Sequence, residues 1–277
     1  MSTPMRGILF FIWMLIWGAG CNAQQLTTQE KEAEGLVYRI PAKARYFTTD
    51  YLQQVYAVTS DNTLIKYSPE GRELFRYNNN RQGQLASVDA SNPLNILLFY
   101  ADYQRLVTLD RTLNETATID LVNWDFYQTP VVATATDNNL WIYDESRREL
   151  IKVDAQGTRL AQSGNLVQLT GRVPQPVTLL HKRDRVWMSL QDGGLLVFSN
   201  FGQYLQLLPD TVQMPFQILE NQMIYRKDDH LVALDLDRRE KRVLPIPASL
   251  QPAKWIRLEV GRLFALFEDR IEVWRSH

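Results

Sequence analysis

The chain has few of the residues from which catalytic and metal sites are usually built. Its 277 residues include one cysteine and three histidines, which are His181, His230 and His277. The Gly-x-Ser-x-Gly, His-Glu-x-x-His and phosphate-loop motifs are all missing. The histidines fall in different repeats or at the chain end, so we do not expect them to share a metal ion. The sequence therefore predicts no catalytic residues, no metal site and no cofactor.

A charge excess of either sign is also missing. The 30 Lys and Arg residues balance the 31 Asp and Glu residues almost evenly, and the net charge is −1 at pH 7. The basic residues form no block of the kind that contacts phosphate backbones. We therefore do not expect nucleic acid as a partner.

An apolar segment opens the chain. Arg6 precedes the apolar residues 7–17, and Gly18, Ala19 and Gly20 then lead to Cys21. This segment is too short to span a bilayer as a helix and has the order of a secretory signal peptide. Residues 1–20 are therefore predicted to be a signal peptide, and the mature chain to be exported.

The lone cysteine lies where such a peptide would be cleaved. Small residues followed by Cys21 resemble the lipobox of bacterial lipoproteins, although Gly18 stands where that family prefers Leu. The resemblance implies a lipid on Cys21, and Asn22 in place of Asp implies sorting to the outer membrane, facing the periplasm. Residues 21–34 then form a polar tether. The alternative is ordinary cleavage after Ala23, which would leave a soluble periplasmic protein.

A short apolar phrase recurs six times after the tether. It starts with a leucine or isoleucine and ends in most copies at an Asp or Ser that opens a turn; the copies begin at Leu64, Leu106, Leu150, Leu195, Leu231 and Ile271. Spacings of about 36 to 45 residues match the blades of a β-propeller. Each phrase follows another β-rich run, so the two are expected to be the second and third strands of a blade. The turn pattern resembles NHL and related bacterial propellers.

The two ends of the repeat region complement each other. The last repeat stops at His277 without a fourth strand, and residues 36–40 form a strand with no blade of its own. Pairing these elements removes two exposed edges. The sequence therefore predicts one domain, residues 35–277, that is a six-bladed all-β propeller with its last blade closed by the N-terminal strand. Residues 120–130 and 163–176 are long enough for further strands, but they contain no hairpin pattern that would support a seven- or eight-bladed ring.

The irregular segments between blades are the candidate binding sites. They contain the residue types that are enriched at the centres of protein interfaces; the candidates are Trp124, Phe126, Tyr127, Arg172, Met214 and Phe216. Two alternatives are that Trp124 and Phe216 fill gaps between blades, or that the aromatics stack on a sugar. Aspartates recur in the six hairpins, at Asp61, Asp102, Asp144, Asp192, Asp228 and Asp269. We interpret them as turn residues, with a ring-shaped cation or sugar site as the alternative.

These observations favour a non-enzymatic scaffold that binds other envelope proteins, such as components of an outer-membrane complex. The chain is similar in type to the propeller lipoprotein of the outer-membrane β-barrel assembly machinery, although it differs in blade count and repeat motif. A second hypothesis is a propeller that binds a small molecule or glycan, which requires polar residues from several innermost strands to converge on the axis. A third is a lactonase- or lyase-type enzyme, which the shortage of histidine disfavours.

Overall fold

A computed structural model of the chain describes residues 35–208 and 216–276. The predicted signal peptide, the predicted lipidation site Cys21 and the predicted tether lie outside the described residues, as does Met214. None of the helices in the described part has the length and apolar content that a membrane span requires.

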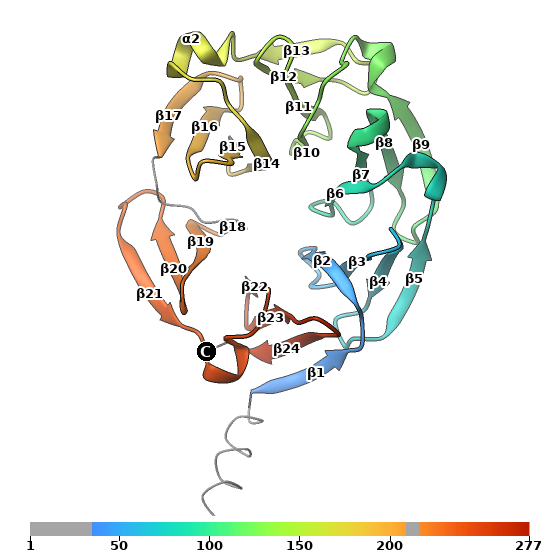
Figure 1. The fold of residues 1–277 in the computed structure, drawn as a ribbon, viewed down its shortest axis with the longest axis vertical. Coiled ribbons are helices and arrows are strands. Elements are labelled where there is room, and N and C mark those ends of the chain that lie inside the picture. Colours follow the sequence, from blue (N-terminus) through green and yellow to red (C-terminus); the bar gives the residue numbers. More distant parts are fainter. Residues whose placement is uncertain (1–34, 209–215, 277) are drawn as a thin grey trace, which may run out of the picture. The chain divides into compact units, whose positions relative to one another are not determined.

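Six four-stranded sheets stand in a ring and form the blades of a β-propeller (Figure 1). The first two blades contain β2 (Ala44–Thr49), β3 (Val55–Thr59), β4 (Leu64–Tyr67) and β5 (Glu73–Tyr77), then β6 (Leu85–Asp89), β7 (Ile96–Tyr100), β8 (Arg105–Leu109) and β9 (Glu115–Asp120). The third and fourth contain β10 (Val132–Thr134), β11 (Leu140–Asp144), β12 (Glu149–Val153) and β13 (Arg159–Gln162), then β14 (Pro176–Lys182), β15 (Arg185–Leu190), β16 (Leu195–Ser199) and β17 (Tyr204–Leu208). The fifth contains β18 (Phe216–Leu219), β19 (Gln222–Lys227), β20 (His230–Asp235) and β21 (Lys241–Pro245).

The sixth blade closes the ring with strands from both ends of the domain. Its order is β1 (Leu36–Ile40), β24 (Ile271–Arg275), β23 (Arg262–Leu266) and β22 (Trp255–Glu259). Strands β1 and β24 lie side by side at the bottom of Figure 1. The predicted six blades and the predicted closure by the N-terminal strand are both confirmed.

Burial follows the position of a strand in its blade. All five residues of β7 and of β11 are buried, whereas most residues of the outer strands β5 and β9 are exposed. A strand between two neighbouring blades is covered on both faces and therefore carries apolar residues at consecutive positions. The buried clusters accordingly lie at the seams; one joins Ile271 and Phe264 of the last blade to Phe47 and Val55 of the first.

A β-bulge recurs between the third and fourth strands of the first four blades. The register shifts by one residue after Lys66, Thr108, Lys152 and Val197, which occupy corresponding positions in these blades. A bulge increases the local twist. The recurring shift therefore turns each outer strand away from the direction of the three strands inside it.

Short helices occupy some of the connections. They are η1 (Asn80–Gln82), η2 (Ala101–Tyr103), η3 (Leu121–Trp124), α2 (Leu166–Thr170) and η4 (Ala248–Leu250). The two stretches that were long enough for extra strands contain η3 and α2 in place of a hairpin, which is consistent with six blades.

Candidate functional site

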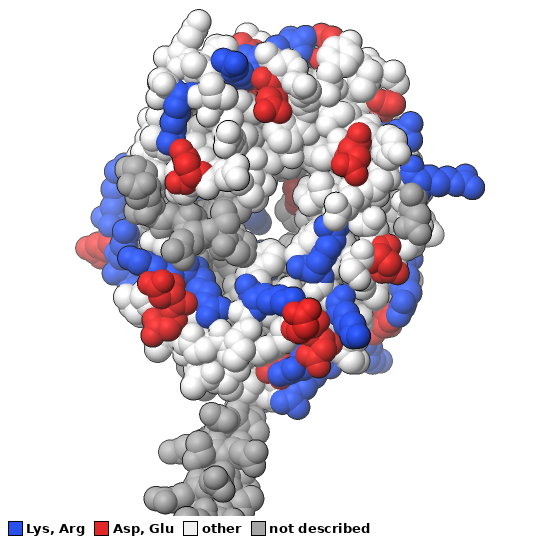
Figure 2. Space-filling view, viewed as in Figure 1, with Lys and Arg blue, Asp and Glu red and all other residues white. Residues whose placement is uncertain are grey.

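The hairpins between second and third strands open on the same rim as the connections between blades, because successive strands of a blade alternate in direction. We call this side the hairpin rim. Figure 2 shows acidic and basic side chains interspersed on the face that it draws, with a hollow at the centre. No field of one charge sign covers that face.

The connection between the second and third blades is held in place by polar contacts. Asp120 caps η3 by accepting a hydrogen bond from the Val122 amide at 3.0 Å. Asp125 then adopts a left-handed conformation, and its backbone carbonyl accepts a hydrogen bond from Arg147 Nη1 at 2.9 Å. Arg147 also pairs with the carboxylates of Asp125 and Asp144. This connection is therefore anchored to the hairpin of the third blade.

The three aromatic candidates in this connection have different surroundings. Phe126 is fully buried in the cluster that joins the second and third blades, and Trp124 packs against that cluster. The Trp124 ring also covers Gly157, where an added Cβ would lie 2.5 Å from it. Tyr127 is 57% exposed. Of the three, Tyr127 is thus the side chain most available to a partner, and the role of all three in partner binding stays a prediction.

The remaining described candidates lie in two other connections. Arg172 follows α2, and its Nη1 atom donates to Asp192 Oδ2 at 2.6 Å in the hairpin of the fourth blade. Phe216 begins β18 and is buried in the seam between the fourth and fifth blades. Arg172 therefore ties the connection after α2 to the hairpin of the fourth blade. Phe216 fills the gap between two blades, which is the alternative to partner binding for this residue.

Exposed apolar side chains occur on or beside three short helices of the hairpin rim. They are Tyr103 in η2, Val122 in η3 and Tyr127 after it, and Leu169 in α2 and Val173 after it; we call these five residues the rim patch. Asn165 caps α2 by accepting hydrogen bonds from the amides of Val167 and Gln168. Capped and hydrogen-bonded turns hold these side chains in place without burying them.

The hairpin aspartates are mainly turn residues. Asp144 accepts the Arg147 amide at 3.1 Å, Asp192 accepts the Gly194 amide at 3.3 Å, and Asp61 accepts the Thr63 hydroxyl at 3.2 Å. Within residues 35–208 and 216–276, no three His, Cys, Asp or Glu side chains are grouped so that they could hold a metal ion. The turn interpretation therefore accounts for the contacts of these three aspartates, whereas Asp102 accepts the Gln84 amide at 3.2 Å, in the connection between the first and second blades.

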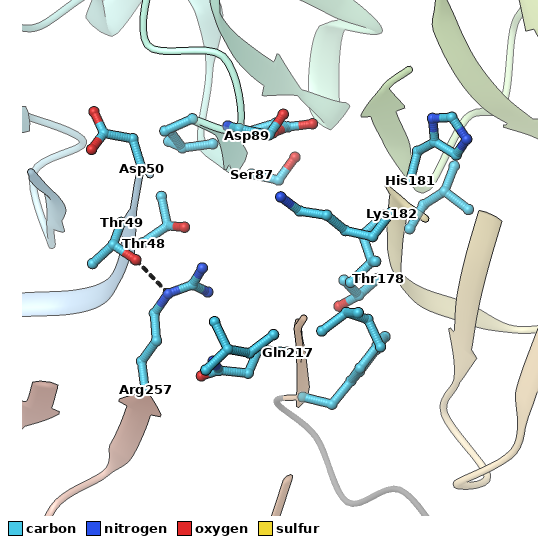
Figure 3. Close-up of a pocket in the computed structure, with 18 of the residues that line it drawn as sticks. Thr48, Thr49, Asp50, Ser87, Asp89, Thr178, His181, Lys182, Gln217 and Arg257 are labelled. Carbon is cyan, nitrogen blue, oxygen red and sulfur yellow. Dashed lines mark hydrogen bonds between the residues drawn. The ribbon is translucent and has the colours of Figure 1, made fainter. Parts of the chain in front are cut away.

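A second candidate site lies on the axis of the ring. A cavity of about 860 Å³ is lined by the innermost strand of every blade, β2, β6, β10, β14, β18 and β22. Figure 3 shows the labelled polar side chains around it, including Thr48, Ser87, Thr178, Lys182 and Arg257. This is the convergence of polar residues that a ligand-binding propeller requires.

Side chains of the innermost strands also join one blade to the next around this cavity. The Thr134 amide of the third blade donates to Asp89 Oδ2 of the second at 2.8 Å. Leu258 and Gln217 form a similar bond between the sixth and fifth blades, and Arg257 Nε donates to Thr49 Oγ1 of the first blade at 2.6 Å (Figure 3). These bonds satisfy buried polar groups and hold the inner wall in one arrangement.

His181 belongs to this set of contacts. Its Nδ1 atom accepts a hydrogen bond from the Thr136 amide at 3.0 Å, so the proton of the neutral ring is on Nε2. Burial of the ring, together with the nearby Lys152, lowers the pKa of His181 below its usual 6.5. The side chain is 5% exposed. It is therefore a neutral group whose Nδ1 atom is engaged by the backbone, while its Nε2 atom has no hydrogen-bond partner among the described residues.

The sequence interpretation missed the polar residues of the cavity. Arg257 stands among apolar residues in β22, and Lys182 ends β14. A charged residue inside an apolar strand was an available signal for Arg257. Alternation along one strand cannot, however, show which faces of six separate strands meet on the axis.

Comparisons with known proteins support the fold. The chain matches no family model, and no curated protein matches its sequence. Among solved structures, streptogramin B lyase is 11% identical with a TM-score of 0.57, over 83% of this chain and 78% of that one. The Pan2 WD40 domain of Neurospora crassa is 9% identical with a TM-score of 0.56, over 85% and 89%. BamB from Moraxella catarrhalis is 16% identical with a TM-score of 0.45, over 80% and 70%. At these identities the comparisons with the lyase and the WD40 domain show the propeller fold alone.

Proposed function

We propose that this chain is a non-enzymatic scaffold of the cell envelope, anchored to the outer membrane by a lipid on Cys21 and facing the periplasm. Its hairpin rim binds protein partners, which are components of an outer-membrane complex. The observation that carries this proposal is the rim patch, because its five apolar side chains are exposed on fixed turns.

The residue types and the fixed turns of the rim patch favour protein binding. Tyrosine offers a large apolar surface with one hydroxyl and few rotatable bonds, so it loses little conformational entropy when a partner covers it. Elements that are already ordered lower the entropic cost of association further. The ion pairs of Asp125 with Arg147 and of Arg172 with Asp192 place charged groups in the same connections and in the hairpins beside them. An apolar centre with a polar border is the usual arrangement of a protein interface.

An enzymatic role has less support from the described residues. A lyase or lactonase mechanism needs a proton acceptor or a metal at the reacting atom. His181 is buried with its Nδ1 atom engaged, and His230 pairs with Asp229 at 3.0 Å at the hairpin end of β20. We therefore favour binding over catalysis as the activity of this fold.

Co-purification from the native membrane tests the scaffold role. The full chain would be extracted in mild detergent, and the double variant Val122→Ser with Tyr127→Ser compared with Phe201→Ser. Phe201 is 74% exposed, in the turn between β16 and β17 on the opposite rim. We expect the rim variant to lose a partner that the wild type and the Phe201 variant both retain. A monodisperse monomer without partners in all three preparations would refute the scaffold role.

Lipid labelling tests the anchor separately. Cells grown with an alkyne-tagged fatty acid should label the wild type, and Cys21→Ser should abolish the label and release the chain from the outer-membrane fraction. Unchanged fractionation of the unlabelled Cys21→Ser chain would contradict the lipid anchor without bearing on the rim patch.

A further inference from the structure

The axial cavity contains hydrogen-bond donors that the protein does not use. Its volume of about 860 Å³ lies within the range of small-molecule sites, roughly 300 to 1,000 Å³. Figure 3 shows the side chains of Lys182 and Arg257 entering it from two different blades. A void left by imperfect packing of apolar side chains would not be expected to contain two such cations.

Lys182 has a fixed backbone and a free amino group. It ends β14, where it pairs with Arg185 of β15, and its carbonyl accepts a hydrogen bond from Trp187 Nε1 at 3.2 Å. Within residues 35–208 and 216–276, the Lys182 Nζ atom makes no hydrogen bond or ion pair. It reaches toward the middle of the cavity in Figure 3. An ammonium group has three donors, so this position is ready to bind an acceptor.

Arg257 presents the other cation. Its Nε atom donates to Thr49 Oγ1 at 2.6 Å and to Glu259 Oε1 at 2.9 Å. The two acceptors share the single Nε hydrogen, and this contact fixes the orientation of the guanidinium. The terminal Nη1 and Nη2 groups have no acceptor among the described residues, and Figure 3 shows them facing the cavity. A guanidinium held in this way can bind two oxygens of a carboxylate or phosphate.

Three of the carboxylates on the inner wall, Asp50, Asp89 and Glu259, are already engaged, whereas Glu220, in the turn after β18, also lines the cavity and makes no hydrogen bond or ion pair within residues 35–208 and 216–276. Asp89 accepts the amides of Thr134 and Ser91, at 2.8 and 2.9 Å. Asp50 accepts the amides of Leu52 and Gln54 and the hydroxyl of Tyr56, at 2.9 to 3.0 Å. Glu259 is paired with Arg257. The donors left to meet a ligand are therefore those of Lys182, Arg257 and Arg183, the His181 Nε2 atom, and the neighbouring hydroxyls of Thr48, Ser87 and Thr178.

We propose that the axial cavity binds a small anionic molecule, whose carboxylate or phosphate group lies between Lys182 and Arg257. Glu259 offsets the charge of Arg257 on its Nε side, but the Nη groups of Arg257 and the amino group of Lys182 keep free donors that the oxygens of an anion would accept from. The hydroxyls around them can orient the rest of the molecule. This site is independent of the rim patch and adds a ligand-binding activity to the proposed scaffold.

Calorimetry with the purified full chain in detergent tests the site. Citrate and inorganic phosphate serve as carboxylate and phosphate probes, and maltose serves as a neutral probe. We expect at least one anion to bind with a dissociation constant below about 1 mM, and maltose not to bind. The anion should also raise the melting temperature of the chain.

Two variants and one control decide the role of the cations. Lys182→Met removes an amino group without a protein partner, so it should leave folding unchanged and weaken anion binding at least about tenfold. Arg257→Lys keeps the charge but not the two-oxygen geometry, and should weaken binding less. Lys254→Met, which removes a lysine outside the cavity that pairs with Glu268, should bind as the wild type does. Absence of anion binding up to about 10 mM, or equal affinity in Lys182→Met and Lys254→Met, would overturn the proposal.

Discussion

Arg39 Nε donates a hydrogen bond to Glu272 Oε1 at 2.9 Å across a sequence separation of 233 residues. Arg39 lies in β1 and Glu272 in β24, so this ion pair joins the first and last strands of the propeller. The neighbouring Tyr38 packs on Gly71 in the first blade, where an added Cβ would lie 2.5 Å from its ring. Strand β1 therefore completes the last blade and also contacts the first.

Replacing Glu272 should weaken the closure of the ring in a pH-dependent way. The carboxylate is 3% exposed and accepts from Arg39, Arg270 and Trp274. Burial alone would raise the pKa of Glu272, but these three hydrogen bonds outweigh it and hold the pKa below 4.5. The contribution to stability is therefore complete above about pH 4.5 and is lost as the pH falls through the folded-state pKa. We expect Glu272→Gln to lower the free energy of unfolding by about 1 to 3 kcal/mol at pH 7.

Urea unfolding at several pH values checks this expectation. The difference between wild type and Glu272→Gln should shrink below pH 4.5, whereas Glu145→Gln, at an exposed hairpin carboxylate, should change stability little at any pH. A difference that stays constant down to pH 3 would show that the ionised carboxylate is not the source of the effect.

Gly157 and Gly193 form a matched pair for testing the contact between neighbouring blades. Both have positive φ angles, of 82° and 89°. A Cβ on Gly157 would meet the Trp124 ring at 2.5 Å, whereas a Cβ on Gly193 would have nothing within 4 Å. We expect Gly193→Ala to cost about 1 kcal/mol from backbone strain alone and Gly157→Ala about 2 to 4 kcal/mol. Thermal unfolding measures both, and equal losses would contradict the close packing of Trp124.

Gln217 should contribute to the junction between the fifth and sixth blades. Its Oε1 atom accepts the Leu258 amide at 2.9 Å, and its Nε2 atom donates to the Leu258 carbonyl. Gln217→Ala leaves both backbone groups without these partners, and we expect a loss of about 1 to 3 kcal/mol. Hydrogen exchange of the Leu258 amide should accelerate in this variant but not in Gln156→Ala, at an exposed turn position. Unchanged exchange in Gln217→Ala would count against this role.

His181 should make the stability fall under mildly acidic conditions. Its pKa is lowered by burial and by Lys152, so the unfolded chain binds a proton more readily than the folded chain. Stability should therefore decrease as the pH falls below 6.5 and level off below the folded-state pKa. His181→Gln retains an acceptor for the Thr136 amide and does not titrate, so its stability should be flatter between pH 6.5 and 5. An NMR titration of the His181 ring gives the pKa directly, and a value above 6.5 would contradict the assignment.

Much of the fold was predictable because its signals are local and repeated. The phrases that begin at Leu64 and Leu231 carry apolar residues at consecutive positions, and both form buried third strands. The same reasoning could not separate Phe126, which is buried, from Tyr127, which is exposed one residue later. Phe126 is buried because it packs in the seam between the second and third blades, whereas Tyr127 remains exposed. The sequence of the connection alone does not show which of its side chains enters the seam.

The sequence by itself determined the number of blades, their strand order and the pairing of residues 36–40 with the last repeat, because strand length, turn chemistry and an unpaired edge are all set by short segments. Only the tertiary structure decided what stands on the axis and on the rim. Lys182 and Arg257 are 75 residues apart along the chain, and they face one cavity only because the closed ring brings the innermost strands of all six blades together. Long-range placement of this kind depends on the angle between successive blades, which is set by side-chain packing at every seam.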